Sequence, residues 1–151
     1  MLTEVSVLPA ELGEKLHGSE LIGFDGTCVL WSYFYRFVVR HDRAGRFRFA
    51  TAQSPLGQAL YGALDLSTDD FETNLVITRG HIYGELDSVA ATCRAPGGIW
   101  TPATALGWLP RWIKSPLYRV IARNRFRLFG RFDSCMMPSP EARARFVEGG
   151  L

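Results

Sequence analysis

The chain has 151 residues, of which 47% are hydrophobic and 21% charged, the composition of an ordinary folded domain with a hydrophobic core. Its net charge is only +2, but residues 1–100 carry −4 and residues 101–151 carry +6. The basic part therefore faces either an anionic partner or the acidic part of the same chain. Three widely spaced cysteines argue against a disulfide framework, and none has the spacing of a zinc site.

The first residues lack the basic and long apolar segments of a signal peptide, and no apolar run approaches the length of a membrane span. We therefore expect a protein of the reducing cytoplasm without a membrane partner. Residues 1–19 are predicted to form an N-terminal extension with a short helix near 10–16. Residues 20–151 are predicted to form a single domain.

Hydrophobic periodicity and turn residues divide the rest of the chain into strands and helices. Four Ser-Pro or Thr-Pro pairs mark helix starts, because the hydroxyl can cap the helix and proline suits its first position. Arg79-Gly80 marks a hairpin turn, and Gly130 the end of a long helix. Strands are predicted over 20–24, 46–50, 74–78 and 81–85, and helices over 29–41, 55–64, 88–94, 102–109, 116–129 and 140–147.

The order of these elements is β-α-β-α-β-β-α, followed by further helices. The first β-α-β unit predicts two parallel strands joined by a right-handed crossover, and the hairpin adds an antiparallel edge. Cys28 lies between the end of the first strand and the start of the first helix. This order, with a cysteine at that place, predicts an α/β protein with a thioredoxin-like core and extra C-terminal helices.

The segment Phe24-Asp25-Gly26-Thr27-Cys28 resembles the signature of the DCC family of predicted thiol-disulfide oxidoreductases, a domain of unknown function. The family pattern is Asp-x-x-Cys-x-x-Cys. Segments 46–54, 118–126 and 129–146 also resemble the family, so that the similarity covers roughly residues 20–148, nearly the whole chain. The resemblance implies a thioredoxin-like fold and thiol-disulfide exchange.

The chain departs from the family pattern at the second cysteine, where it has Trp31. It also has no proline before Asn74, where a thioredoxin has its cis-proline. In a C-x-x-C enzyme the second thiol resolves the mixed disulfide that the first one forms. Cys28 would therefore act as a single nucleophile, resolved by an external thiol such as glutathione or by Cys135.

Two effects oppose each other at Cys28. The unpaired N–H groups of a helix start favour the thiolate, whereas a carboxylate at Asp25 disfavours it. Asp25 could accept a proton from the thiol, or it could hydrogen-bond the N–H groups of its own turn. Cys28 itself is either reactive or a small apolar residue left from a dithiol ancestor, and Cys93 is expected to be a buried structural residue.

Candidate binding residues are Trp31, on the same helix face as Cys28, and Arg123, Asn124 and Arg125 in a basic and aromatic segment. Instead of binding a partner, the segment could be a solvated helix face whose arginines pair with acidic residues of the same chain. Asn124 would then hydrogen-bond backbone groups. The expected partner is a protein with a reactive thiol or disulfide, or a small thiol. A nucleic acid is not expected, since no such motif is visible, and neither is a metal or a bound cofactor.

Two functions remain open from the sequence. One is a thiol-disulfide oxidoreductase-like protein that uses Cys28 alone. The other is a non-catalytic thioredoxin-like module, retained for binding or assembly after the loss of its dithiol chemistry.

Overall fold

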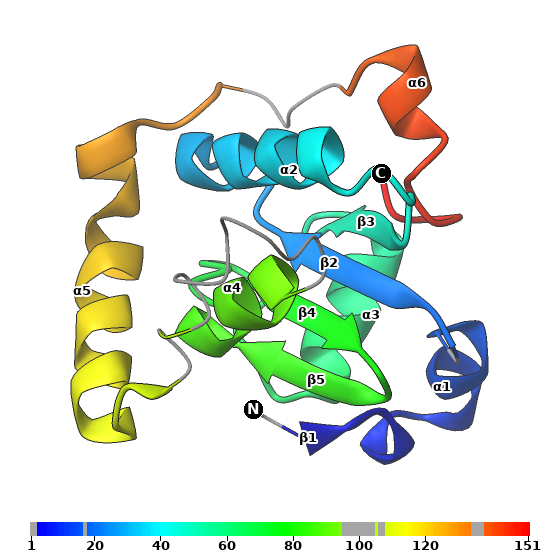
Figure 1. Cartoon of the computed structure of the whole chain (residues 1–151), viewed down its shortest axis with the longest axis horizontal. Coiled ribbons are helices and arrows are strands. Elements are labelled where there is room, and N and C mark those ends of the chain that lie inside the picture. Colours follow the sequence, from blue (N-terminus) through cyan, green and yellow to red (C-terminus); the bar gives the residue numbers. More distant parts are fainter. Residues whose placement is uncertain (1–2, 17, 95–104, 106–107, 134–137) are drawn as a thin grey trace.

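The computed structural model describes residues 3–16, 18–94, 105, 108–133 and 138–151. A five-stranded mixed sheet lies at its centre, in the order β1-β5-β4-β2-β3 (Figure 1). The strands are β1 (Thr3–Glu4), β2 (Glu20–Phe24), β3 (Phe47–Thr51), β4 (Leu75–Thr78) and β5 (His81–Gly84). The α-helices are α1 (Ala10–Leu16), α2 (Val29–His41), α3 (Pro55–Ala63), α4 (Glu85–Arg94), α5 (Arg111–Phe129) and α6 (Pro140–Arg143).

The predicted β-α-β unit and hairpin are both present. Strands β2 and β3 are parallel and joined through α2, while β4 runs antiparallel to β2 and β5 antiparallel to β4. In this register Ile22 lies opposite Phe49 on one side and opposite Val76 on the other. The order β3-β2-β4-β5 is that of a thioredoxin-like core, so the predicted fold class is confirmed.

Successive residues of β2 point to opposite faces of the sheet, as strand geometry requires. Leu21 belongs to a core cluster with residues of α1 and α3, whereas Ile22 packs in a second cluster with residues of α2, α4 and α5. Both side chains are fully buried. The sheet is therefore covered on both faces, and Cys28 belongs to the second cluster.

The N-terminal segment is bound to this core. Strand β1 pairs antiparallel with β5, and Leu8 and Leu16 are buried in the cluster on the α1 and α3 face. Helix α1 occurs where the short helix was predicted. Hydrophobic burial of these two leucines holds the segment against the sheet.

Several predicted helix boundaries agree with the structure. Helix α2 spans the predicted residues, and Ser54 caps α3 by accepting a hydrogen bond from the N–H of Gly57 at 3.1 Å. Gly130 ends α5 with a φ of 91°, a conformation open to glycine but strained for other residues. The predicted helix over 102–109 lies mostly outside the described residues.

Other boundaries were predicted wrongly, because tertiary contacts override local signals. Helix α5 begins at Arg111 rather than at Pro116, and Lys114 in its first turns is buried against Asp87 at 2.5 Å. Helix α4 begins at Glu85 rather than at Ser88, so that Asp87 lies within its first turn.

The last predicted helix is also too long. It ends at Arg143, since the backbone of 145–147 pairs with Phe49 of β3: the N–H of Phe49 donates to the carbonyl of Arg145, and the N–H of Val147 donates to the carbonyl of Phe49.

Helical periodicity over 29–41 predicts a core-facing side with Leu30, Phe34, Phe37, Val38 and His41, and the structure agrees with it only in part. Val38 is buried, but the other four residues are half-buried. The fully buried residues of the helix are Trp31, Ser32, Tyr35 and Val38. The cause is that α2 is packed on two sides, by the sheet and by α5, so its apolar surface is wider than one stripe.

Among the described helices, none combines the length and hydrophobicity that a membrane-spanning helix needs.

Candidate functional site

The motif loop joins the carboxyl end of β2 to the start of α2. Cys28 occupies the N-cap of α2, and its N–H donates to the carbonyl of Asp25 at 3.2 Å. Its side chain makes no capping hydrogen bond, although the N–H groups of Leu30 and Trp31 in the first turn act on the thiol and lower its pKa. This is the placement of the thiol that the sequence predicted.

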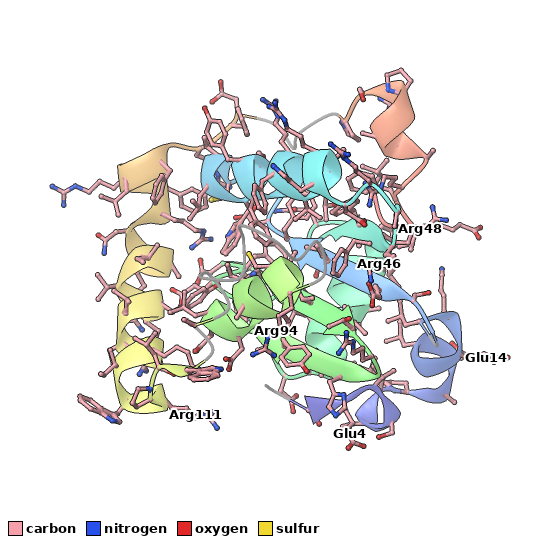
Figure 2. The ribbon with its side chains drawn as sticks, viewed as in Figure 1. Glu4, Glu14, Arg46, Arg48, Arg94 and Arg111 are labelled. Carbon is pink, nitrogen blue, oxygen red and sulfur yellow. The ribbon has the colours of Figure 1, made fainter. Side chains whose placement is uncertain are left out.

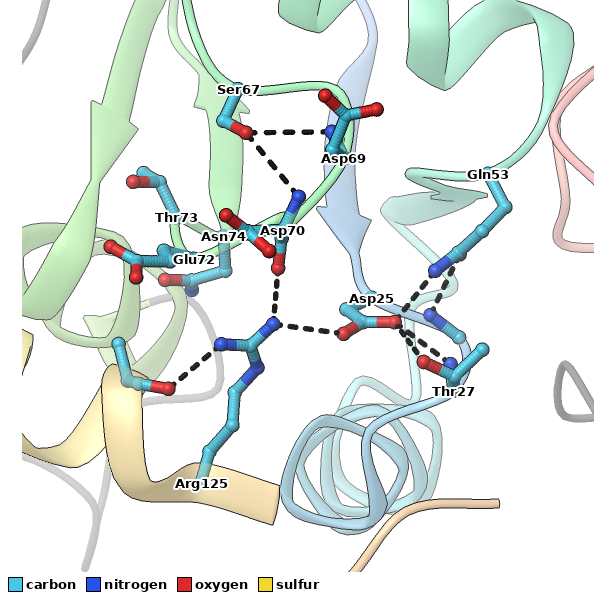
Figure 3. A network of polar contacts seen from close by, with 12 residues as sticks. Asp25, Thr27, Gln53, Ser67, Asp69, Asp70, Glu72, Thr73, Asn74 and Arg125 are labelled. Carbon is cyan, nitrogen blue, oxygen red and sulfur yellow. Dashed lines mark hydrogen bonds and ion pairs between the residues drawn. The ribbon is translucent and has the colours of Figure 1, made fainter. Parts of the chain in front are cut away.

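Asp25 is buried and receives hydrogen bonds through both carboxylate oxygens (Figure 3). Oδ1 accepts from the N–H of Thr27 at 2.9 Å, from the Thr27 hydroxyl at 2.7 Å and from Nε2 of Gln53 at 2.6 Å. Oδ2 faces Nη2 of Arg125 at 3.4 Å. The contacts to Thr27 match the predicted alternative in which Asp25 hydrogen-bonds groups of its own turn. Together with the contacts to Gln53 and Arg125, they hold the loop before Cys28 in one conformation.

Arg125 is buried beside this carboxylate and donates hydrogen bonds through both Nη atoms, whereas its Nε has no partner among the described residues. Its Nη1 donates to the carbonyl of Ala122 at 2.7 Å, and its Nη2 also donates to the carbonyl of Asp70 (Figure 3). The chain thus brings together a carboxylate from the β2–α2 loop and a guanidinium from α5. A buried ion pair needs such additional hydrogen bonds to offset the cost of removing both charges from water.

Cys28 is fully buried, with a relative exposure of 0%. Burial raises the pKa of the thiol above its ordinary value. The N–H groups of Trp31 and Leu30 act in the opposite direction, as expected for a helix start, while Asp25 raises the pKa and Arg125 lowers it. Desolvation outweighs the helix start, so the thiol is protonated at neutral pH in this conformation.

Residues 130–132, which we call the covering segment, lie over the motif loop. Arg131 forms an antiparallel bridge with Cys28, and the N–H of Phe132 donates to the carbonyl of Thr27 at 2.9 Å. The turn at Gly130, just after α5, directs the segment across the start of α2. Access to Cys28 from this side therefore requires the covering segment to move.

Trp31 occupies the position of the second motif cysteine and is buried between α2 and α5. Its indole Nε1 has no hydrogen-bond partner among the described residues. The ring contributes to the wall of an apolar cleft of about 280 Å³ between α2, α4 and α5, together with Ile121 and Arg125. A bulky apolar side chain therefore fills the place where a dithiol enzyme has its resolving sulfur.

The other candidates are dispersed. Arg123 is exposed and lies 3.8 Å from Glu72, and Asn124 donates from Nδ2 to the carbonyl of Val120 at 2.8 Å. Cys93 is buried in α4, and burial raises the pKa of its thiol. Cys135 lies outside the described residues. Within the described part of the chain, no group of three metal-ligating side chains occurs.

Sequence reasoning did not assign Gln53 or Asp70 to the site, whereas residues 130–132 lie in the segment 129–146 that resembles the family. Gln53 bonds Asp25, from which it is 28 positions away in the sequence. Asp70 bonds Arg125, from which it is 55 positions away. For Gln53 a signal existed, because it lies within one of the segments that resemble the family. The carbonyl of Asp70 could not have been found, since any residue type supplies it.

The fold and the site define an α/β protein of thioredoxin-like architecture with one cysteine at the start of its first core helix. Residues 22–131 match the model of the DCC1-like thiol-disulfide oxidoreductases. The chain belongs to this family.

Two relatives support the assignment. The uncharacterized protein YuxK of Bacillus subtilis is 32% identical over 124 residues, covering 82% of this chain and 90% of YuxK. A chloroplastic DCC family protein of Arabidopsis thaliana is 31% identical over 116 residues, covering 74% of this chain and 66% of the plant protein. No solved structure matches the chain.

Proposed function

We propose that the protein carries out thiol-disulfide exchange with Cys28 as its single nucleophile. The observation that carries this proposal is the position of Cys28 at the N-cap of α2, directly after β2 of a thioredoxin-like core. Membership of a family described as thiol-disulfide oxidoreductases supports the same reaction class. The expected partner is a disulfide-containing protein or a small thiol in a reducing cytoplasm.

The reaction would proceed by successive thiol-disulfide exchange steps. The Cys28 thiolate attacks one sulfur of a substrate disulfide, that S–S bond breaks, and the departing thiolate takes up a proton. A second thiolate then attacks the mixed disulfide and releases the other half of the substrate as a thiol. If this second thiol is glutathione, another glutathione regenerates free Cys28 and leaves as glutathione disulfide, and the two electrons come from glutathione.

Cys135 is the alternative resolving thiol. It follows Phe132 by three positions in the sequence, and the N–H of Phe132 bonds the motif loop next to Cys28. Attack by Cys135 would leave a Cys28–Cys135 disulfide, which an external dithiol would have to reduce. The thiolate needed for the first step would form when the covering segment moves away, because solvent then removes the desolvation that raises the pKa of Cys28.

Asp25 is proposed to position the motif loop rather than to take the proton of Cys28. Its two oxygens already face Thr27, Gln53 and Arg125. Trp31, Arg123 and Asn124 remain proposed binding residues, Trp31 because it lies in the wall of the apolar cleft beside the motif.

A second candidate function rests on the burial of Cys28. A fully buried thiol with a raised pKa, next to Trp31 in place of a resolving cysteine, suits a thioredoxin-like module that binds a partner without redox chemistry. In that case Cys28 serves only as a small apolar core residue.

Glutathione-coupled reduction of hydroxyethyl disulfide separates the two functions. The Cys28→Ser variant should lose the activity, and Cys93→Ser, the matched control for another buried thiol, should keep it. Cys135→Ser should lose activity only if Cys135 is the resolving residue. If the wild-type protein is inactive, or if Cys28→Ser is as active as wild type, the non-catalytic module is the better account.

A further inference from the structure

Among the residues that the structure describes, helix α5 packs against the domain along one side. Its buried residues are Lys114, Tyr118, Ala122 and Arg125, which follow one another at helical spacing and face α2 and α4. In Figure 1 the helix stands at the edge of the molecule, and Figure 2 shows side chains on its outer side pointing away from the rest of the domain. The outer surface of α5 is therefore open to solvent.

This outer surface carries a row of apolar side chains. Ile113, Leu117, Val120 and Leu128 share one side of the helix, and all four are exposed. Val120 is 60% and Leu128 62% exposed. Exposed apolar residues are ordinary when scattered, but a row along a 19-residue helix marks an interaction surface.

A row of basic side chains lies beside the apolar row. This row consists of Arg119, Arg123 and Arg127, which are exposed and spaced four residues apart. It runs along the helix next to the apolar row. Trp112, which is 76% exposed, lies in line with these arginines near the N-terminal end of the helix. No residue of 111–129 is acidic, whereas a solvent-facing helix usually mixes both charges.

The charges decide which occupant fits this surface. A second copy of the chain would bring the arginines of two α5 helices together, which like-charge repulsion opposes. A nucleic acid would leave the apolar row uncovered, because interfaces with nucleic acids are strongly polar. An anionic lipid surface meets both rows, since its headgroups attract arginine and its acyl boundary accepts Leu, Val and Trp.

We propose that the outer surface of α5 binds the surface of an anionic lipid bilayer. At 1.5 Å per residue the helix is about 28 Å long, so that its whole length can lie in the plane of the interface. Such a helix lies on a membrane without spanning it. A membrane partner was not expected from the residue pattern, because the pattern does not show that these apolar residues are exposed.

Sedimentation with vesicles tests the proposal. The full chain should bind vesicles of phosphatidylcholine that contain phosphatidylglycerol, and it should bind vesicles of phosphatidylcholine alone much more weakly. Each arginine near an anionic surface contributes about a fivefold change in partitioning, so Arg119→Gln/Arg127→Gln should weaken binding about 20-fold or more. Added salt should weaken the binding of the wild-type protein.

Matched variants control for charge and hydrophobicity. Arg43→Gln/Arg79→Gln removes the same charge from exposed sites outside α5 and should bind about as well as wild type. Val120→Ser/Leu128→Ser should weaken binding, whereas Val7→Ser/Tyr33→Ser, at residues 62% and 66% exposed, should not. Circular dichroism spectra would confirm that all variants are folded.

Several results would overturn the proposal. They are absence of binding to the anionic vesicles, equal binding by the α5 and control variants, and a dimer in analytical ultracentrifugation that Val120→Ser/Leu128→Ser dissociates. The last result would assign the surface to a second copy. Because the assay requires no thiol chemistry, its failure would leave the proposed exchange reaction untouched.

Discussion

The guanidinium of Arg125 lies 3.4 Å from the carboxylate of Asp25, although the two residues are 100 positions apart in the sequence. Both side chains are almost completely buried. Asp25 belongs to the motif loop before Cys28, and Arg125 belongs to the helix that leads into the covering segment. The ion pair therefore joins the two parts of the chain that enclose the thiol.

Loss of the Arg125 charge should destabilise the fold strongly, because Asp25 would be left buried without a counter-charge. Arg125→Met is expected to lower the free energy of unfolding by about 3–5 kcal/mol, measured by urea denaturation. The control Arg123→Met removes an exposed partner of Glu72 and should cost less than about 1 kcal/mol. Adding Asp25→Asn to Arg125→Met should recover part of the loss; if the effects of the two substitutions simply add, the pair is not coupled.

The buried thiols should make stability depend on pH in the alkaline range. The pKa values of Cys28 and Cys93 are raised in the folded state by burial, so the unfolded chain loses these protons first. Their contribution is complete below the unfolded thiol pKa of about 8.5 and is lost as the pH rises through the folded-state pKa.

Urea unfolding between pH 7 and about pH 9, about one unit below the ordinary tyrosine pKa of about 10, measures this dependence. In a Cys135→Ser background, the free energy of unfolding should fall with pH, and Cys28→Ala/Cys93→Ala should flatten the curve. An equally steep curve for that variant would show that other groups cause the dependence.

Replacing Gly130 by alanine should strain the backbone there and make Cys28 more accessible. The φ of 91° and ψ of 171° of Gly130 lie in a region open almost only to glycine, so an alanine there costs about 1–3 kcal/mol. Gly130→Ala should loosen the covering segment and speed the alkylation of Cys28 by iodoacetamide about tenfold, with little effect on Cys93.

Gly45→Ala is the matched control, since Gly45 also has a positive φ, of 63°, but belongs to the turn between α2 and β3. The control should leave the labelling of Cys28 close to wild type. Equal acceleration by both variants would indicate general loosening of the fold rather than release of the cover.

Replacing Trp31 by cysteine should restore the dithiol motif. The Trp31→Cys substitution places a second thiol one helical turn after Cys28, with the spacing of a C-x-x-C pair, and thiol quantification should detect a disulfide between the two after mild oxidation. The loss of a buried indole should lower the free energy of unfolding by about 3–5 kcal/mol. Trp31→Ser controls for that cavity, and a Trp31→Cys protein that keeps both thiols free after oxidation would contradict the expected geometry.

Local patterns were sufficient to predict the core of the fold. Strand β2, helix α2, the Ser54 cap and the hairpin at Gly80 each depend on neighbouring residues, so their signals lie in short segments. Gly130 was likewise identified as a helix end from sequence. Predictions failed where contacts with distant segments determine the end of a helix. Helix α6 ends early because the backbone of 145–147 pairs with β3.

The site was predicted only in part for the same reason. The sequence placed Cys28 at a helix start and Asp25 in a turn, since both depend on the local motif. The sign of the thiol pKa shift depends on burial, which the packing of α2 and α5 determines. The pairing of C-terminal arginines with acidic residues was open as an alternative, but the particular pair of Asp25 and Arg125 could not be read from spacing.

The proposed reaction depends above all on Cys28 being the thiol that reacts with disulfides. Incubation of the native protein with glutathione disulfide, followed by peptide mass spectrometry, locates the glutathione adduct directly. We predict that Cys28 is modified well before the buried Cys93, with a mixed disulfide on Cys28 or a Cys28–Cys135 disulfide as the product. An unmodified Cys28 under these conditions, or modification of Cys28 no faster than of Cys93, would contradict the proposal.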